Sequence, residues 1–469
     1  MNKQSQLLEM KITENEAALL KCATSYAVEY LEQLSEMPPF PSEESLEKCS
    51  LFEELLPEHS CEASQVINLL GEHGSKMTVA HTGGRYFGFV CGGVLPVALS
   101  ARWIADTWDQ NNALYAMSPI ASVLENLCER WLVELLHLPN HTAAGMVGGS
   151  SVAIITALTA ARNAILLKTG WDVHLRGLFG APRLRVIIGE QAHSSVLKAL
   201  SMIGIGVDMI ERVPVDEQGR MRLECMRLPD ANTLIVVQAG NVNSGSFDPI
   251  DEICQIAEKV GAWVHVDGAF GLWAAASRRT KYLCKGIERA NSWSTDAHKT
   301  LNAPYDSGIV FCKDRDQLVR AMQASGAYIE YSSARDNMLY TPEMSRRARS
   351  IELWAILKTL GREGVEALVD QLCHMATYFS ERLSDVGFII GNEVVFNQII
   401  VQCESQATTI ATLEGIKKSG VCWCGGTTWF GKPAIRVSVS SWRTDEEAID
   451  LCVDAFISAR ECARRNSSK

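Results

Sequence analysis

The sequence predicts an α/β fold, with a large domain around a buried, mostly parallel sheet and a smaller α+β domain at the C-terminus. Between residues 85 and 330, short β-rich runs alternate with helical stretches of about ten to fifteen residues, a rhythm typical of βαβ units. From about residue 345 the pattern changes to long helices with few strands. The length of 469 residues also exceeds what one hydrophobic core usually organises.

The first segment, residues 1–84, is predicted to be helical. Apolar residues recur at intervals of three and four in "EAALLKCATSYAVEYLEQL", and the loop "SEMPPFPSEES" follows. We therefore expect an N-terminal helical segment that precedes the sheet.

The large domain is assigned to residues 85–344. Its expected strands include "RVIIGE", "TLIVVQAG", "AWVHVDGAF" and "SGIVFCK", which are apolar enough to be buried on both faces. Parallel sheets of this kind bind ligands at the carboxyl ends of their strands. The smaller domain, residues 345–469, opens on the helical "SRRARSIELWAILKTLG" and contains the strand-like "FNQIIVQC" and "AIRVSVSS".

Composition excludes several classes of function. The net charge is −11 and the Lys and Arg residues are scattered, so we expect no nucleic-acid partner. The longest apolar stretch, residues 145–167, contains paired glycines and Arg162, so we expect no membrane span. The first residues lack the basic, apolar and small-residue order of a secretory signal, and most of the fifteen cysteines lie in apolar contexts. These features favour a cytoplasmic protein in which Cys422 and Cys424 pack in the interior rather than bind metal.

Two charged residues end strand-like runs. Asp267 follows the apolar "WVHV", where a carboxylate is costly unless a positive or hydrogen-bonding group meets it. Lys299 ends "NSWSTDAHK", and a desolvated lysine there becomes an amine nucleophile for carbonyl compounds. Taken singly, each residue is as well explained by a turn or a surface position; the pair indicates chemistry.

A glycine- and serine-rich turn opens a helix in "MVGGSSVAIITALTAAR". The N–H groups and partial positive charge of a helix start favour an anion, so Ser150 and Ser151 are candidate phosphate ligands, although many such turns bind nothing. His193 follows "RVIIGE" directly and reaches the same edge of the sheet, where its ring is able to stack on a flat ligand. Amine, acid, anion site and imidazole together predict pyridoxal 5′-phosphate.

The chain resembles the fold-type I pyridoxal-phosphate enzymes, and more narrowly the group II amino-acid decarboxylases related to aromatic-amino-acid and glutamate decarboxylases. The resemblance runs from about Arg85 to the C-terminus, and its most specific elements are "AHSSVLKA", "HVDGAFG", "STDAHKTLN" and "SRRARSIELWAILKTLG". It implies an aspartate-aminotransferase-like fold with a sheet of seven strands, and a homodimer with active sites at the subunit interface. The implied reaction is decarboxylation of an amino acid through a lysine aldimine and a quinonoid intermediate.

The resemblance also implies roles for single residues. Lys299 would form the aldimine, Asp267 would pair with the ring nitrogen, and His193 would stack on the ring. The remaining implied contacts are Ser150 and Ser151 to phosphate, His298 beside the lysine, Ala269 on the other ring face, Asn243 or Ser244 near the cofactor, Arg436 on a substrate carboxylate, and Phe87 at the substrate entrance.

The proton donor departs from the family pattern. The loop tyrosine of the decarboxylases falls near Asn337 in this chain, which leaves Tyr340, Tyr328 or Tyr331 as candidates, with Tyr340 preferred. Relatives altered at that position divert to other outcomes, so a carbon–carbon lyase of aldol type and an aminotransferase remain alternatives with the same cofactor.

A rival of another class uses the same segments differently. His265 and Asp267 alternate on one strand, and Asp296 and His298 on another, which gives the ligand set of a metal-dependent hydrolase. This alternative leaves Lys299 and the Gly-Ser turn without a role, and we expect no metal.

Overall fold

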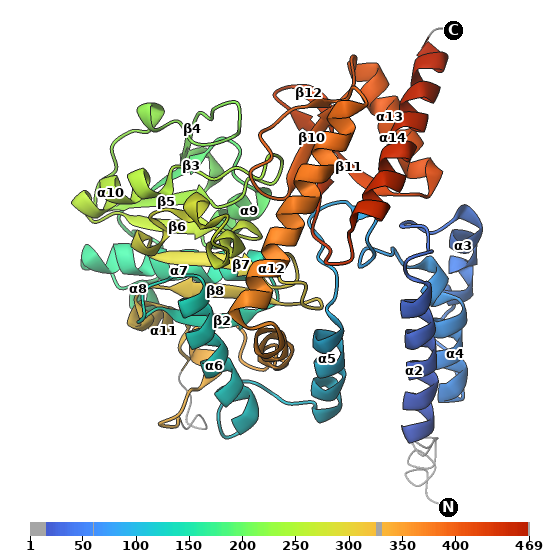
Figure 1. The fold of residues 1–469 in the computed structure, drawn as a ribbon. Helices are drawn as coiled ribbons and strands as arrows, with labels where there is room; N and C mark the ends of the chain where they lie inside the picture. Colours follow the sequence, from blue (N-terminus) through green and yellow to red (C-terminus); the bar gives the residue numbers. More distant parts are fainter. Residues whose placement is uncertain (1–15, 60, 325–330, 468–469) are drawn as a thin grey trace, which may run out of the picture.

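The computed structural model describes residues 16–59, 61–324 and 331–467, which form an N-terminal helical part, a large domain and a C-terminal domain (Figure 1). The N-terminal part contains α2 (Glu16–Gln33), α3 (Glu43–Glu47), η1 (Lys48–Phe52), α4 (Ala63–Glu72) and η2 (Gly74–Met77). In Figure 1, α2 and α4 lie side by side and apart from the sheet of the large domain.

The large domain is built on a seven-stranded sheet in the order β2-β8-β7-β6-β5-β3-β4. Its strands are β2 (Ala143–Val147), β3 (Arg185–Gly189), β4 (Ile210–Val213), β5 (Thr233–Gln238), β6 (Trp263–Asp267), β7 (Ser292–Asp296) and β8 (Gly308–Cys312). Strand β8 runs antiparallel to both of its neighbours, and all the other pairings in this sheet are parallel. The predicted sheet, mostly parallel and seven-stranded, is therefore confirmed.

Helices cover both faces of this sheet. The helices of the large domain are α5 (Pro96–Trp108), α6 (Pro119–Leu135), α7 (Ser150–Lys168), α8 (Val173–Arg176), α9 (Ser194–Met202), α10 (Ile250–Val260) and α11 (Arg315–Met322), with short 3₁₀ turns η3 (Val207–Met209), η4 (Leu223–Cys225), η5 (Gly271–Ala276), η6 (Lys281–Cys284), η7 (Ile287–Arg289) and η8 (Asn337–Tyr340). Among them α6, α7, α10 and α11 contact strands of the sheet. Successive residues of β5 enter opposite cores: Leu234 packs with α7 and α9, whereas Ile235 packs on the other side of the sheet. This two-sided burial explains why the strands are apolar throughout.

Helix α7 is long and apolar enough to cross a membrane by length and composition alone. In the structure it packs against β6, β7 and β8, and its buried residues, Ile154, Leu158 and Ile165 among them, belong to the core of the large domain. Its apolar character is therefore accounted for by burial against the sheet.

The C-terminal domain has a five-stranded sheet in the order β1-β11-β12-β10-β9. Its elements are β1 (Tyr86–Phe87), β9 (Ile389–Ile390), β10 (Gln398–Gln402), β11 (Trp423–Trp429), β12 (Lys432–Ser438), α12 (Ser350–Asp385), α13 (Gln406–Ser419) and α14 (Glu446–Ser467). Cys422 and Cys424 are buried in its core, as predicted.

One segment lies in a different sheet from the one that the domain assignment implied. Tyr86 and Phe87, at the start of the predicted large domain, pair in parallel with Trp423 and Cys424 of the C-terminal sheet. A strand of two residues has too short a pattern to show which sheet it joins, because the partner strand lies far along the chain.

Candidate active site

The candidate active site lies at one edge of the seven-stranded sheet, where loops follow the carboxyl ends of its parallel strands. Strand β6 ends at Asp267 and β7 ends at Asp296, three residues before Lys299. His193 follows β3, and the Gly-Ser turn follows β2. This edge is where open parallel sheets bind ligands, and it assembles the four features that the sequence analysis singled out.

Lys299 is held at this edge by an ion pair. Its Nζ lies 3.0 Å from Oδ2 of Asp296, and 19% of its side chain is exposed. The chain opposite it approaches closely, since the Gly92 N–H donates to the carbonyl of His298 at 3.2 Å and a Cβ on Gly92 would collide with the carbonyl of Lys299. The amine is thus partly desolvated and fixed in place.

Asp267 is buried, with 5% of its surface exposed. Among the residues that the structure describes, its side chain accepts one hydrogen bond, from the Ala269 N–H at 3.3 Å. Burial raises its pKa, while the nearby charges of His193 and Lys299 lower it. A buried carboxylate with so few partners is suited to accept a charged N–H from a ligand.

His193 occupies the N-cap position of α9. Its Nδ1 lies 3.2 Å from the Ser195 N and 2.7 Å from the Ser195 Oγ, and the side chain as a whole is solvent-exposed. Desolvation by its surroundings lowers its pKa, whereas the charge of Asp267 raises it. The ring is therefore oriented by its own helix start and keeps a free face.

His298 lies next to Lys299 but is buried in the loop. Its Nδ1 is 2.9 Å from the carbonyl oxygen of Ser307, and its ring lies 4.2 Å from that of Tyr305. Burial lowers the pKa of His298. The Tyr305 hydroxyl donates to the Cys91 Sγ at 3.5 Å, which ties this loop to the segment before α5.

Three other predicted cofactor contacts, Ser150, Ser151 and Ala269, belong to segments that are hydrogen-bonded to Asp296 or Asp267. Ser150 and Ser151 are the first residues of α7, Ser150 half-buried and Ser151 exposed, and the Ser150 N–H donates to Oδ1 of Asp296 at 2.6 Å. Ala269 donates to Asp267 and its carbonyl accepts from the Asp296 N–H at 2.8 Å.

Asn243 and Ser244 face other groups. The Oδ1 of Asn243 accepts from Thr427 of β11 at 2.9 Å, so this side chain links the two domains. Ser244 is buried and donates to the carbonyl of Gln218 at 2.6 Å. Ser244 is therefore a structural residue, and the alternative that it contacts the cofactor is not supported by its position.

Arg436 extends from β12 toward the site. Its guanidinium donates to the carbonyls of Val242 at 3.4 Å and Phe89 at 3.2 Å, and its buried Nε has no partner in the described part of the chain. Its charge acts on His193 and lowers the pKa of that imidazole. Among the described residues no carboxylate pairs with Arg436, so a cation is available to a ligand.

The structure contradicts the placement of Phe87 at the substrate entrance. Phe87 is fully buried in the C-terminal core, 5.2 Å from the ring of Phe379. Phe89, two residues on, is 63% exposed, and its carbonyl accepts from Arg436. The aromatic residue that borders the site is therefore Phe89.

Tyr340, the preferred proton donor, is packed in the core of the large domain. Its hydroxyl accepts from Arg315 at 2.8 Å, the guanidinium of Arg335 lies 3.9 Å from its ring centroid, and 8% of it is exposed. Two cations and a buried core position favour a structural role for Tyr340, and its role as the proton donor stays a prediction. Tyr331 is exposed and donates to the carbonyl of Ala324 at 2.5 Å, while Tyr328 lies outside the described residues.

The metal alternative finds no support in the side-chain arrangement. His265 is fully buried, its Nδ1 lies 3.0 Å from the Ser292 Oγ, and burial lowers its pKa to about 3. Within residues 16–59, 61–324 and 331–467, no three His, Cys, Asp or Glu side chains form a group suited to hold a metal ion.

Asp296 and Tyr305 lie near Lys299 and His298, but their sequence patterns do not predict this. The pattern around Asp296 suggests only a metal ligand, yet Asp296 contacts both Lys299 and the start of α7. The signal was present, because Asp296 ends β7 in the same way that Asp267 ends β6. Tyr305 carried no such signal, since its contact with His298 depends on the turn between them.

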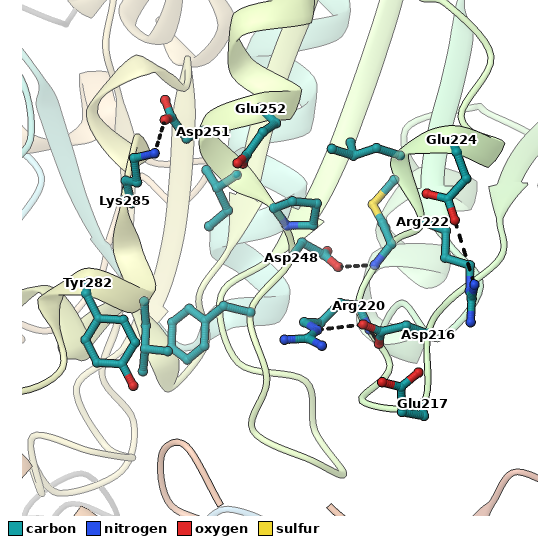
Figure 2. A pocket seen from close by; sticks show the side chains of 16 residues that line it. Asp216, Glu217, Arg220, Arg222, Glu224, Asp248, Asp251, Glu252, Tyr282 and Lys285 are labelled. Atoms are coloured by element: carbon teal, nitrogen blue, oxygen red, sulfur yellow. Dashed lines mark hydrogen bonds and ion pairs between the residues drawn. The ribbon is translucent and has the colours of Figure 1, made fainter. Parts of the chain in front are cut away.

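A separate surface pocket of about 510 Å³ lies elsewhere on the large domain and is lined by acidic and basic side chains (Figure 2). Its floor includes Asp248, whose carboxylate accepts the backbone N–H groups of Met221 at 2.8 Å and Gln238 at 2.7 Å. Burial raises the pKa of Asp248 to about 6, because desolvation outweighs these two hydrogen bonds.

This buried acid predicts a pH-dependent stability. A folded-state pKa raised from 3.8 to about 6 means that the folded chain binds the extra proton, so stability falls as pH rises between these values. The unfolding free energy of the wild type relative to Asp248→Asn should decrease by roughly 2–3 kcal/mol from pH 4 to pH 7. Denaturant unfolding at both pH values measures it, and an unchanged difference would contradict the burial of a titrating acid.

The family model and the similar proteins found by comparison point to the same family. The model described as the pyridoxal-dependent decarboxylase conserved domain matches residues 63–402. Aspartate 1-decarboxylase of Aliivibrio fischeri is 32% identical over 262 residues, which cover 52% of this chain and 48% of that protein. Cysteine sulfinic acid decarboxylase of Mus musculus is 28% identical over 313 residues, 64% of this chain and 62% of the relative. The alignment thus spans about half the length of the first relative.

Solved structures extend the likeness to nearly the whole chain. Oryza sativa TDC with PLP and tryptamine has a TM-score of 0.88 at 21% identity, covering 96% of this chain and 98% of the other. Mouse CSAD has a TM-score of 0.87 at 23% identity, covering 96% and 99%. At these identities the likeness establishes a common fold.

Proposed function

The chain belongs to the family of pyridoxal-dependent decarboxylases, and from this premise we propose that it is an amino-acid decarboxylase whose site is built on Lys299 and Asp267. The fold-type I architecture predicted from the sequence is confirmed. The observation that carries the proposal is the buried Asp267 carboxylate, which ends β6 at the same edge of the sheet where Lys299 follows β7.

The residues present fit pyridoxal 5′-phosphate. Asp267 has a single hydrogen-bond donor among the described residues and is suited to a charged pyridine nitrogen. Lys299 supplies the amine for the aldehyde, His193 presents an exposed ring, and α7 offers Ser150, Ser151 and its helix start to the phosphate. When bound, this cofactor supplies an electron-accepting ring for the bond that breaks at the substrate Cα.

Each residue then has a definite task. Asp267 would hold a proton at the ring nitrogen, because a buried carboxylate stabilises a positive partner strongly. His193 would stack on the ring with a side chain that its own N-cap bonds keep in place. Lys299 would supply the amine for the cofactor's aldehyde, and the close packing of Gly92 against the carbonyls of His298 and Lys299 holds the backbone of this loop.

Arg436 is proposed to bind a carboxylate of the substrate. Its Nε is buried without a partner, and burial lowers its pKa, a cost that an incoming carboxylate would offset. Relatives of this chain are named for aspartate, cysteine sulfinic acid, tyrosine and tryptophan. Each of these amino acids has an α-carboxylate. Charge recognition at this arginine is therefore compatible with several side chains.

The test is carbon dioxide release from a panel of amino acids. With cofactor added, at least one of aspartate, cysteine sulfinate, glutamate, tyrosine and tryptophan should release carbon dioxide and yield the matching amine. Arg436→Gln should raise KM on the order of tenfold or more with a smaller change in kcat, since binding is lost before chemistry. If the main product is a keto acid or an aldehyde, the reaction is transamination or carbon–carbon cleavage rather than decarboxylation.

The second part of the proposal is a homodimer with the active sites near its interface. Large apolar side chains are exposed on neighbouring elements: Leu20 and Val28 on α2, Leu70 on α4, Trp103, Ile104 and Trp108 on α5, and Ile120 and Val123 on α6. A cavity of about 660 Å³ between α2, α4 and α5 is lined mostly by apolar groups. An apolar surface of this extent favours a partner, and symmetry makes a second copy the simplest one.

The apolar surface is connected to the site through α5. The segment before this helix carries Gly92, next to Lys299, and the Leu95 N–H donates to the carbonyl of Asn302 at 3.0 Å. Ile104→Glu combined with Val123→Glu should convert the dimer to a monomer, as measured by light scattering at micromolar concentration. The same double variant should have lower activity. The exposed polar control Lys198→Glu should stay dimeric, and a monomeric wild type would contradict the dimer.

A reducing compartment is the last part of the proposal. All fifteen cysteines are free, and several are buried in apolar cores where a disulfide is not required for stability. This supports the cytoplasm as the place of action.

A further inference from the structure

Asp296 is a buried carboxylate that the proposed reaction leaves without a task. It is 1% exposed, and its two oxygens face different groups. Oδ2 lies 3.0 Å from Nζ of Lys299, and Oδ1 accepts the Ser150 N–H at 2.6 Å. One carboxylate therefore contacts both the amine assigned to the cofactor's aldehyde and the helix start assigned to its phosphate.

The backbone around Asp296 fixes the carboxylate in this position. Its N–H donates to the carbonyl of Ala269 at 2.8 Å, and its own carbonyl accepts from the indole N–H of Trp273 at 3.0 Å. His298 Nε2 lies 3.7 Å from Oδ2. Because the N–H and the carbonyl of Asp296 are both hydrogen-bonded, its backbone is held in place. When a charged ligand binds nearby, the carboxylate is therefore expected to move by rotation of its side chain.

We propose that Asp296 is a positioning residue that holds Lys299 before the cofactor arrives and competes with the cofactor's phosphate for the start of α7. The inference rests on the proposed function, since it concerns the same site. Oδ2 of Asp296 contacts the Nζ atom that would attack the aldehyde, so this contact has to be broken before the amine reacts. Asp296 thus acts through Lys299 and Ser150 rather than on the substrate.

The competition follows from charge. A helix start carries about half a positive charge, and Asp296 already uses part of it through the Ser150 N–H. A phosphate dianion at the same place meets a like charge in a site of reduced dielectric, which disfavours it. Phosphate binding should therefore draw Asp296 away from Ser150 and weaken its hold on Lys299, so that the amine is released when the phosphate is seated.

Asp296→Asn separates the charge from the hydrogen bond. The amide oxygen still accepts from the Ser150 N–H, but the negative charge beside Lys299 and the phosphate is lost. Inorganic phosphate and pyridoxal phosphate should bind the cofactor-free variant about tenfold more tightly or better than the wild type. Pyridoxal, which has no phosphate, should gain much less.

The measurement is calorimetric titration of the cofactor-free full chain with inorganic phosphate, with pyridoxal phosphate and with pyridoxal. The matched control is Asp314→Asn, because Asp314 also accepts N–H groups at a helix start, from Asp316 and Gln317 of α11. The control should bind all three ligands as the wild type does. Equal or weaker phosphate binding by Asp296→Asn would overturn the inference while leaving the proposed function in place.

A second pair of variants keeps the test valid if Asp296→Asn folds poorly. Lys299→Met leaves the charge of Asp296 uncompensated, so inorganic phosphate should bind it more weakly than the wild type, and the double variant with Asp296→Asn should recover the loss. Independent effects of the two changes would overturn the coupling. If neither the wild type nor any variant binds pyridoxal phosphate, the proposed function fails and this inference fails with it.

Discussion

Lys299→Ala is expected to reduce carbon dioxide release on the order of 10³-fold or more, because the amine that receives the cofactor's aldehyde is removed. The effect should be almost entirely on kcat, since Arg436, which we propose to bind the substrate carboxylate, is unchanged. The variant leaves the buried Asp296 without its cationic partner, so its stability should fall, and its turnover is to be measured under conditions where it is folded.

The control for this result is Lys198→Ala. Lys198 lies on the exposed side of α9, five residues after His193, and its loss removes a lysine without touching the site. It should retain wild-type turnover. Wild-type turnover by Lys299→Ala would remove the basis of the assignment.

Asp267→Asn is expected to give a chain that still takes up the cofactor and shows its colour but turns over slowly. A carboxylate and a charged ring nitrogen attract one another by about 4 kcal/mol at contact with an effective dielectric constant of 20. Loss of this charge should lower kcat on the order of 10²- to 10³-fold. Steady-state kinetics and an absorbance spectrum of the same preparation measure both halves of the prediction.

Asp248→Asn provides a matched comparison, because Asp248 is another buried aspartate of the large domain, located in the pocket of Figure 2. It should keep the turnover of the wild type at neutral pH. If both variants lost activity equally, a general loss of buried charge would explain the result and the specific role of Asp267 would be refuted.

The parts predicted well from sequence depend on local patterns. The runs "TLIVVQAG" and "AWVHVDGAF" contain β5 and β6. They can be recognised as strands because strands buried on both faces are apolar throughout. Asp267 and Lys299 were recognisable because a charged residue at the end of such a run is unusual. Their meeting at one edge then follows from the parallel arrangement of the strands.

The parts predicted poorly depend on contacts between distant segments. Phe87 was assigned to the site, but neighbouring residues of a strand face opposite sides, and pairing with β11 directs Phe87 into the core and Tyr86 onto Trp423. The position of Tyr340 in the sequence suggests a proton donor, whereas its environment is set by Arg315 and Arg335. No local pattern around either residue records these partners.

The most direct test of the account is to add pyridoxal phosphate to the purified chain, reduce the complex with borohydride and identify the labelled peptide by mass spectrometry. The account predicts a yellow protein that is bleached by reduction, with the label on Lys299. A colourless protein that takes up no cofactor in excess, or a label on another lysine, would contradict it.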